Sequence, residues 1–246
     1  MTATARVLIL GGTGEARALA QELHARGIPV ISSLAGRVAR PRLPVGDVRV
    51  GGFGGSDALA RWLEDHAITA VIDATHPFAQ RISASAKSAC AAADVPLLRL
   101  ERPGWVAQAG DRWHWVDDLD RAAAAIAELG SRVLLTSGRQ GLAAFAQKAD
   151  SWFLIRCVDP PDAPLPARHQ VVLDRGPYTL EGELALIDEH RIDLLVTKDS
   201  GGPLTGAKLE AARVRSIPVI VVRRPARCTV PTVRTVTAAM DWAQPG

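Results

Sequence analysis

Short runs of apolar residues alternate along this chain with segments in which apolar residues recur every three or four positions. The runs are typical of strands buried in a parallel sheet, and the periodic segments are typical of helices that cover such a sheet. In the N-terminal part, strands are predicted at residues 7–10, 29–32, 48–50, 70–74 and 96–100, and helices at 15–26, 56–66 and 80–93. This alternation predicts βαβ units with parallel strands.

The alternation pauses at residues 101–115, which contain a proline, two glycines and three tryptophans and show no helical period. We place the domain boundary here, with one domain at 1–104 and a second at 105–246. The three tryptophans are expected to pack between the domains rather than to form a platform for a ligand; they are Trp105, Trp113 and Trp115.

A second alternating series follows the pause. Strands are predicted at residues 132–136, 152–158, 170–173, 193–197 and 218–222, and helices at 118–129, 141–148, 179–190 and 205–215. Two similar halves of this kind predict an α/β protein with two Rossmann-like domains, whose mostly parallel sheets face one another across a cleft.

Composition narrows the function classes. Among 246 residues, 29 basic and 26 acidic side chains give a net charge of +3, which is too small to indicate nucleic-acid binding. No apolar stretch approaches the roughly 18 residues of a membrane span, so we expect a cytoplasmic protein with no membrane contact. The three cysteines show no CxxC and no Cys/His spacing suited to zinc, so no metal site is predicted.

The first predicted strand runs into a glycine-rich turn that opens a helix. Glycines at this position let the backbone approach a pyrophosphate, and the N-terminus of the helix attracts the negative charge of the phosphate. Arg17 stands where a third glycine of the usual GxGxxG spacing would fall, so the context supports the assignment more than the spacing does. The candidate cofactor-binding residues of the turn are Gly11, Gly12, Thr13, Gly14 and Glu15.

The end of the second strand favours NADPH over NADH. Domains that bind NAD place an acidic residue there for the ribose 2′-hydroxyl, whereas this chain has Ser33 and, beyond it, Arg37. Hydroxyl and guanidinium groups suit a 2′-phosphate, which a carboxylate would repel. After the third strand, Gly52 and Phe53 fit either an adenine site or a flexible loop.

The fourth strand ends in Asp73-Ala74-Thr75-His76-Pro77-Phe78, at the edge where open α/β sheets bind ligands. Thr75 is a further candidate for the cofactor. His76 is a candidate catalytic residue, because imidazole donates protons and hydrogen bonds near neutral pH.

Polar residues also follow the strands of the second half. Arg139, Arg175 and Lys198 recur at equivalent loop positions and would together form a wall that binds an anionic substrate. Further candidates for contact with the substrate in the same loops are Tyr178, Asp199, Ser200 and Gly201.

Five motifs in the same chain order resemble the precorrin-6A reductase family of cobalamin biosynthesis: GGTGEA, DATHPFA, RGPYT, VTKDSGG and AKLEAA. The resemblance implies an NADPH-dependent oxidoreductase that reduces one double bond of the precorrin-6A macrocycle to give precorrin-6B. It implies a tetrapyrrole substrate rich in carboxylates, and a proton supplied by a site group such as His76 or Lys198, or by water. Family members typically carry a small polar residue where this chain has Asp199.

A short-chain dehydrogenase needs Lys four residues after its catalytic Tyr, and here the single tyrosine, Tyr178, is followed at that spacing by Gly182. A non-catalytic NADPH sensor and a reductase of another polyanionic small molecule both stay open. So does the choice between a metal-free and a cobalt-containing substrate. The pathway context is compatible with transient contacts with neighbouring enzymes.

Overall fold

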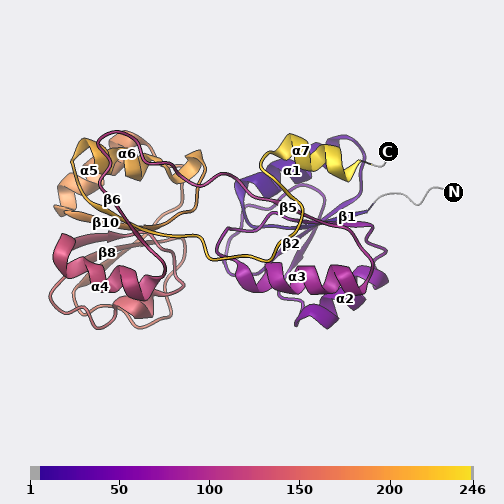
Figure 1. The fold of residues 1–246 in the computed structure, drawn as a ribbon, viewed down its shortest axis with the longest axis horizontal. Helices are drawn as coiled ribbons and strands as arrows, with labels where there is room; N and C mark the ends of the chain where they lie inside the picture. The colour runs from indigo at the N-terminus through magenta and orange to yellow at the C-terminus, as the bar shows by residue number, and fades with distance from the viewer. Residues whose placement is uncertain (1–5, 245–246) are drawn as a thin grey trace. The chain divides into compact units, whose positions relative to one another are not determined.

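The computed structural model describes residues 6–244, which divide into two compact units (Figure 1). Unit 1 runs to Pro103 and resumes at Pro225, and unit 2 comprises Gly104–Arg224. Each is an α/β unit built around a six-stranded sheet in which every paired strand is parallel. The predicted fold class of two Rossmann-like units is thereby confirmed.

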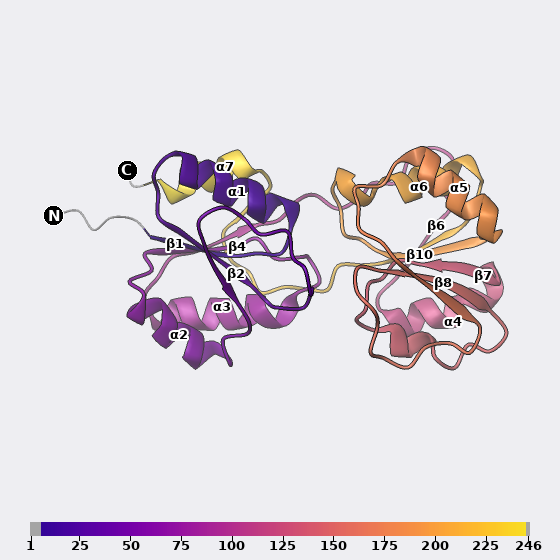
Figure 2. The ribbon, with the colours of Figure 1, turned by 180° about the vertical axis from the view of Figure 1, so that it is seen from behind.

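Unit 1 has the strand order β12-β5-β4-β1-β2-β3. Its strands are β1 (Val7–Leu10), β2 (Val30–Leu34), β3 (Asp47–Val50), β4 (Ala70–Asp73), β5 (Leu97–Leu100) and β12 (Thr232–Val233). Its helices are α1 (Gly14–Ala25), α2 (Ser56–Asp65), α3 (Gln80–Ala92) and α7 (Val236–Ala243). Helices α1 and α7 cover one face of the sheet, and α2 and α3 cover the other, as both views show (Figures 1 and 2).

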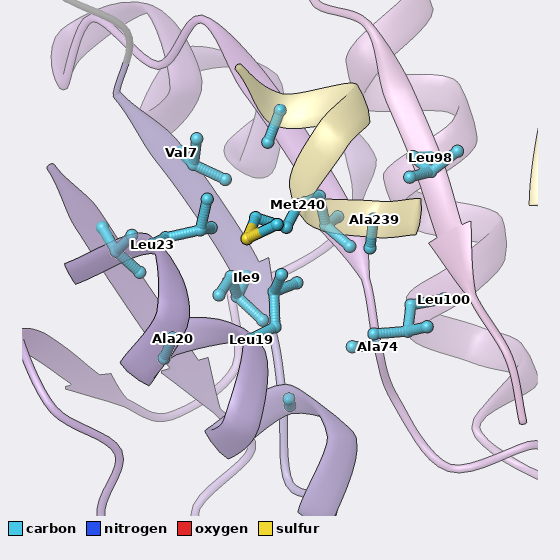
Figure 3. Packing of buried hydrophobic residues seen from close by; sticks show 14 residues of the cluster. Val7, Ile9, Leu19, Ala20, Leu23, Ala74, Leu98, Leu100, Ala239 and Met240 are labelled. Carbon is cyan, nitrogen blue, oxygen red and sulfur yellow. The ribbon is translucent and has the colours of Figure 1, made fainter. Parts of the chain in front are cut away.

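Strand β1 shows why the apolar runs of the sequence become central strands. Successive side chains of a strand point to opposite faces, so a strand covered on both faces must be apolar throughout. Ile9 packs with α1 and α7, against Leu19 and Met240 (Figure 3), while Leu8 and Leu10 join the cluster on the α2–α3 side.

Unit 2 has the strand order β6-β11-β10-β7-β8-β9. Its strands are β6 (Trp113–Val116), β7 (Arg132–Leu135), β8 (Trp152–Cys157), β9 (His169–Leu173), β10 (Leu194–Lys198) and β11 (Val219–Val222). Its helices are α4 (Leu119–Leu129), α5 (Leu180–His190) and α6 (Ala207–Val214), with short 3₁₀ turns η1 (Leu142–Phe145) and η2 (Pro203–Thr205). Helices α5 and α6 lie together on one face of the sheet, and α4 lies on the other (Figure 1).

Three expectations need correction. The segment from Pro225 onward belongs to unit 1 rather than to the second domain, because β12 pairs with β5 and α7 packs against α1. Residues 113–116, where no element was expected, form a strand, and the three tryptophans pack against the core cluster of unit 2. The helix expected at 141–148 is only the turn η1, which begins after Gly141 in the left-handed region.

No helix in the described part of the chain is long and apolar enough to cross a membrane. Likewise, residues 6–244 contain no cluster of three or more His, Cys, Asp or Glu side chains arranged to hold a metal ion.

Candidate functional site

Each sheet has one topological switch point, where the connections from two neighbouring parallel strands lead to opposite sides of the sheet. In unit 1 this point lies between β1 and β4, and in unit 2 between β7 and β10. Loops leaving the carboxyl ends of two such strands diverge, and the crevice between them is where open α/β sheets bind ligands. The loops at these ends are therefore where a ligand site is expected.

The glycine-rich turn lies at the carboxyl end of β1. The N–H of Gly11 donates to the carbonyl oxygen of Ser33 at 2.9 Å, which fixes the turn beside the end of β2. Gly12 has φ of +111°, in the left-handed region that favours glycine, and a Cβ built there would meet no atom within 4 Å. The turn thus presents bare backbone, with open space where a side chain would stand.

Thr13 joins this turn to the loop after β4. Its hydroxyl accepts a hydrogen bond from the Ala16 N–H at 3.1 Å, which caps α1, and donates to the Ala74 carbonyl oxygen at 2.8 Å. The N–H groups of Gly14 and Glu15, in the first turn of α1, have no acceptor within the helix and carry its positive dipole end. The Glu15 carboxylate forms an ion pair with Arg102 at 2.7 Å. A dinucleotide pyrophosphate therefore fits this turn.

Arg49 is a residue of this edge that the sequence analysis missed. In the register of β2 and β3 it lies directly opposite Ser33. Its Nη1 donates to the Ser33 hydroxyl at 3.1 Å and to the Gly51 carbonyl oxygen at 2.8 Å, and its Nη2 donates to the Gly52 carbonyl oxygen at 3.1 Å. The guanidinium carbon lies 3.7 Å from the centre of the Phe53 ring. Ser33, Gly52 and Phe53, all predicted here, thus surround one guanidinium, whereas Arg37 is exposed in the loop beyond β2.

The loop after β4 holds Thr75 and His76. Both the N–H and the hydroxyl of Thr75 donate to Oδ1 of Asp73, at 3.2 and 2.6 Å, so this side chain is turned into the protein. The Phe78 N–H donates to Nδ1 of the half-buried His76 at 3.3 Å. That bond assigns the proton of the neutral ring to Nε2.

Asp73 is the centre of a buried charged network that supports this loop. Its Oδ2 accepts from the Ser83 hydroxyl at 2.6 Å and lies 3.7 Å from Arg99 Nε and 3.5 Å from Arg227 Nη2. Arg227 also pairs with Glu101 at 2.8 Å and donates to the hydroxyls of Thr75 and Ser83. The segment that returns from unit 2 thus fixes the DATHPFA loop from behind.

In unit 2, the strands β7 and β10 bring two of the predicted loops together. Lys198 ends β10, and its Nζ donates to the carbonyl oxygen of Gln140, in the loop after β7, at 3.3 Å. Burial lowers the pKa of the Lys198 amino group. Arg139, in the same loop, lies 3.7 Å from the exposed carboxylate of Asp162.

Arg175 and Tyr178 follow β9, two strands away from β7. Among the described residues, none forms a hydrogen bond or ion pair with the guanidinium of Arg175. The Tyr178 hydroxyl donates to the Asp174 carbonyl oxygen at 3.2 Å, and its ring lies 3.9 Å from the guanidinium carbon of Arg156. Burial raises the pKa of the Tyr178 hydroxyl.

The loop after β10 contains residues that are turned inward. The Asp199 carboxylate accepts from the Trp105 N–H at 3.0 Å and pairs with Arg224 at 3.2 Å, so it closes the start and end of unit 2 together. Gly201 is buried with φ of +65°, and the Ser200 N–H donates to the Lys198 carbonyl oxygen at 2.6 Å. The Asp199 carboxylate is therefore already engaged within unit 2, and its contact with a substrate stays a prediction.

A second buried cluster, Arg156, Glu183 and Lys208, lies between β8, α5 and α6. Arg156 Nη1 is 2.9 Å from Glu183 Oε1, and Lys208 donates to the Thr205 carbonyl oxygen at 2.9 Å. Burial, with the charge of Arg156 adding to it, lowers the pKa of Lys208 to about 7. Lys208 lies in the AKLEAA motif, and it is only 4% exposed.

Both units are doubly wound α/β folds, and unit 1 has a capped glycine turn at its switch point. These features define the dinucleotide-binding class of α/β proteins. Residues 6–244 match the model of the family described as Precorrin-6x reductase CbiJ/CobK, and the chain belongs to this family. Membership of a reductase family of this kind implies a nicotinamide cofactor.

Individual relatives agree with the family match. The chain is 52% identical over 239 residues to a precorrin-6A reductase of Rhodococcus erythropolis, covering 96% of both chains. It is 31% identical over 243 residues to a cobalt-precorrin-6A reductase of Salmonella typhimurium, covering 89% of this chain and 87% of the relative. The solved structure of a CobK precorrin-6A reductase superposes with a TM-score of 0.92 at 42% identity, over 97% of this chain and 95% of that one.

Proposed function

We propose that this protein is an NADPH-dependent oxidoreductase that reduces one double bond of the precorrin-6A macrocycle, giving precorrin-6B in cobalamin biosynthesis. The observation that carries the proposal is the capped, bare glycine turn tied to the loop after β4, in a chain that is 52% identical to a precorrin-6A reductase.

The cofactor is assigned to unit 1. The open space beside Gly12 and the first-turn N–H groups of α1 fit a pyrophosphate, and no acidic residue ends β2 to compete for a 2′-phosphate. Bound there, NADPH supplies hydride to one atom of the reduced bond, and a proton adds to the other. Thr13 and Ala74 would hold the turn in place, and His76 would contact the nicotinamide or the substrate beside it.

The substrate is assigned to the loop ends of unit 2. Arg139, Arg175 and Lys198 supply positive charge for the carboxylates of the macrocycle, and the Tyr178 ring, which follows Arg175 in the same loop, stacks on Arg156. Two exposed apolar side chains lie at the same edge, Val158 after β8 and Leu173 at the end of β9, 40% and 53% exposed. A surface with both cationic and apolar groups suits a flat macrocycle with an acidic periphery.

Proton delivery is assigned to Lys198 or His76. Burial lowers the pKa of Lys198, which brings a lysine closer to the range in which general acids work near neutral pH. His76, with its proton on Nε2, is the alternative donor.

The metal-free macrocycle is the proposed substrate. Relatives named for precorrin-6A are 42% to 54% identical to this chain, whereas relatives named for the cobalt form are 29% to 31% identical. Purified protein should oxidise NADPH in proportion to added metal-free precorrin-6A and more slowly with the cobalt form. Tight NADPH binding without turnover of either would instead indicate a non-catalytic sensor.

A further inference from the structure

Arg49 carries a half-buried charge for which the described part of the chain offers no counter-ion. Its three protein partners are a hydroxyl and two carbonyl oxygens, and none of them is a carboxylate. Within residues 6–244, the Nε–H and the second hydrogen of Nη2 have no acceptor. Burial lowers the pKa of the guanidinium, which means that its surroundings disfavour the charge they hold.

The position of this charge is fixed by the fold. Arg49 pairs in register with Ser33 at the carboxyl end of β2, the place from which a Rossmann domain reads the adenosine ribose. Its stem and head are held by the Ser33 hydroxyl, by two carbonyl oxygens and by the face of Phe53. The Trp62 ring lies beyond, 5.7 Å from the guanidinium carbon. A guanidinium fixed on three sides loses little freedom when it binds an anion on the fourth.

From this arrangement we infer that Arg49 is the residue that binds the 2′-phosphate of NADPH and selects it over NADH. The inference rests on the proposed function, and it replaces the assignment of this role to Arg37. The unused Nε and Nη2 donors suit two phosphate oxygens, and the phosphate supplies the missing negative charge. The Ser33 hydroxyl, already bonded to Arg49, would contact the same group.

The experiment measures the dissociation constants of NADPH, NADH and the fragment 2′,5′-ADP by calorimetry. Arg49→Met keeps the stem over Phe53 and removes the charge. It should weaken NADPH and 2′,5′-ADP by roughly tenfold to a hundredfold, the usual effect of losing a charge-assisted hydrogen bond, and leave NADH nearly unchanged. Arg49→Lys should recover part of the loss. Arg61→Met, on the exposed side of α2, is the matched control and should change none of the three constants.

A second variant tests the same site in the opposite direction. Ser33→Asp places a carboxylate beside Arg49, where it would pair with the guanidinium and accept the ribose 2′-hydroxyl. It should reverse the preference toward NADH, which a variant that merely unfolds cannot do. Thermal melts accompany every titration.

The outcomes separate the inference from the proposed function. Equal losses of NADPH and NADH in a folded Arg49→Met protein would overturn the role of Arg49, as would a selective loss confined to Arg37→Met. A wild-type protein that binds neither dinucleotide would overturn the proposed function, and the inference with it.

Discussion

The hydroxyl of Thr13 donates a hydrogen bond of 2.8 Å to the carbonyl oxygen of Ala74, although 61 residues separate them. The hydroxyl oxygen of Thr13 also accepts a hydrogen bond from the Ala16 N–H and so caps α1. One side chain therefore fixes both the start of α1 and the two loops at the switch point of unit 1.

Thr13→Val keeps the volume of this side chain and removes both bonds. The lost cap should cost about 0.5–2 kcal/mol in the free energy of unfolding, and the loosened turn should weaken NADPH binding. Thr235→Val is the matched control, because Thr235 caps α7 in the same unit but contacts neither loop. Urea unfolding and NADPH titration should show a stability loss in both variants and weaker binding only for Thr13→Val. Normal NADPH binding by that variant would contradict the role of this contact.

Arg175→Met should raise KM for precorrin-6A and leave the affinity for NADPH unchanged. A partly exposed charge pair is worth up to about 1 kcal/mol, which corresponds to roughly fivefold in KM. The difference from wild type should shrink in high salt, because ions screen the attraction. Arg215→Met, which removes an exposed arginine paired with Asp188, serves as the control. If NADPH binding collapses and KM is unchanged, the cofactor and substrate have been assigned to the wrong units.

Lys198→Met tests proton delivery. If Lys198 donates the proton, kcat of the wild type should fall as pH rises through the pKa of this lysine, which burial holds below the ordinary value. The variant should have a lower kcat that no longer shows this decline, with KM changed far less. A pH profile with the same alkaline limb in variant and wild type would assign the proton to another group, with His76→Gln as the next variant to measure.

The cluster around Lys208 makes a prediction about stability and pH. The pKa of Lys208 is about 7 in the folded protein, well below the ordinary value of 10.5. Between these two values the unfolded chain binds a proton that the folded chain does not, so the free energy of unfolding rises with pH across this window. Below about pH 7 the buried Lys208 is charged, and the burial of this charge then lowers the free energy of unfolding by its full amount.

Lys208→Met should therefore stabilise the protein at pH 6, by about 1–4 kcal/mol, and much less at pH 9. Arg156 and Glu183 still pair in this variant. Urea unfolding at the two pH values measures the difference, and Lys87→Met, at an exposed lysine of α3, should show none. A variant that is less stable than wild type at pH 6 would show that the amino group stabilises this core.

Local features of the chain were predictable, and long-range pairing was not. The strand, glycine turn and helix at residues 7–25 follow from apolar runs and backbone requirements within one stretch of sequence. Strand β12 has only two residues, Thr232 and Val233, and becomes a strand because β5 pairs with it. Nothing local in that segment indicates a return to unit 1.

The same reason explains why the sequence alone does not indicate a site role for Arg49. Its neighbours in sequence predict a strand followed by a glycine loop, and an arginine at such a strand end is usually a solvated charge. Only the register that places Arg49 opposite Ser33 brings its guanidinium to the end of β2. Conversely, the place of Asp199 directly after β10 predicts a contact with the substrate, whereas its engagement by Trp105 and Arg224 depends on residues far away in sequence.

The most direct test of the central claim is the transfer of an isotope. Wild-type protein is incubated with metal-free precorrin-6A and NADPH that carries deuterium on the transferable position of the nicotinamide, and the product is analysed by mass spectrometry. The account predicts reduced macrocycle with one deuterium from the cofactor and one hydrogen from solvent. Unreduced macrocycle, or reduced product without deuterium, would contradict it.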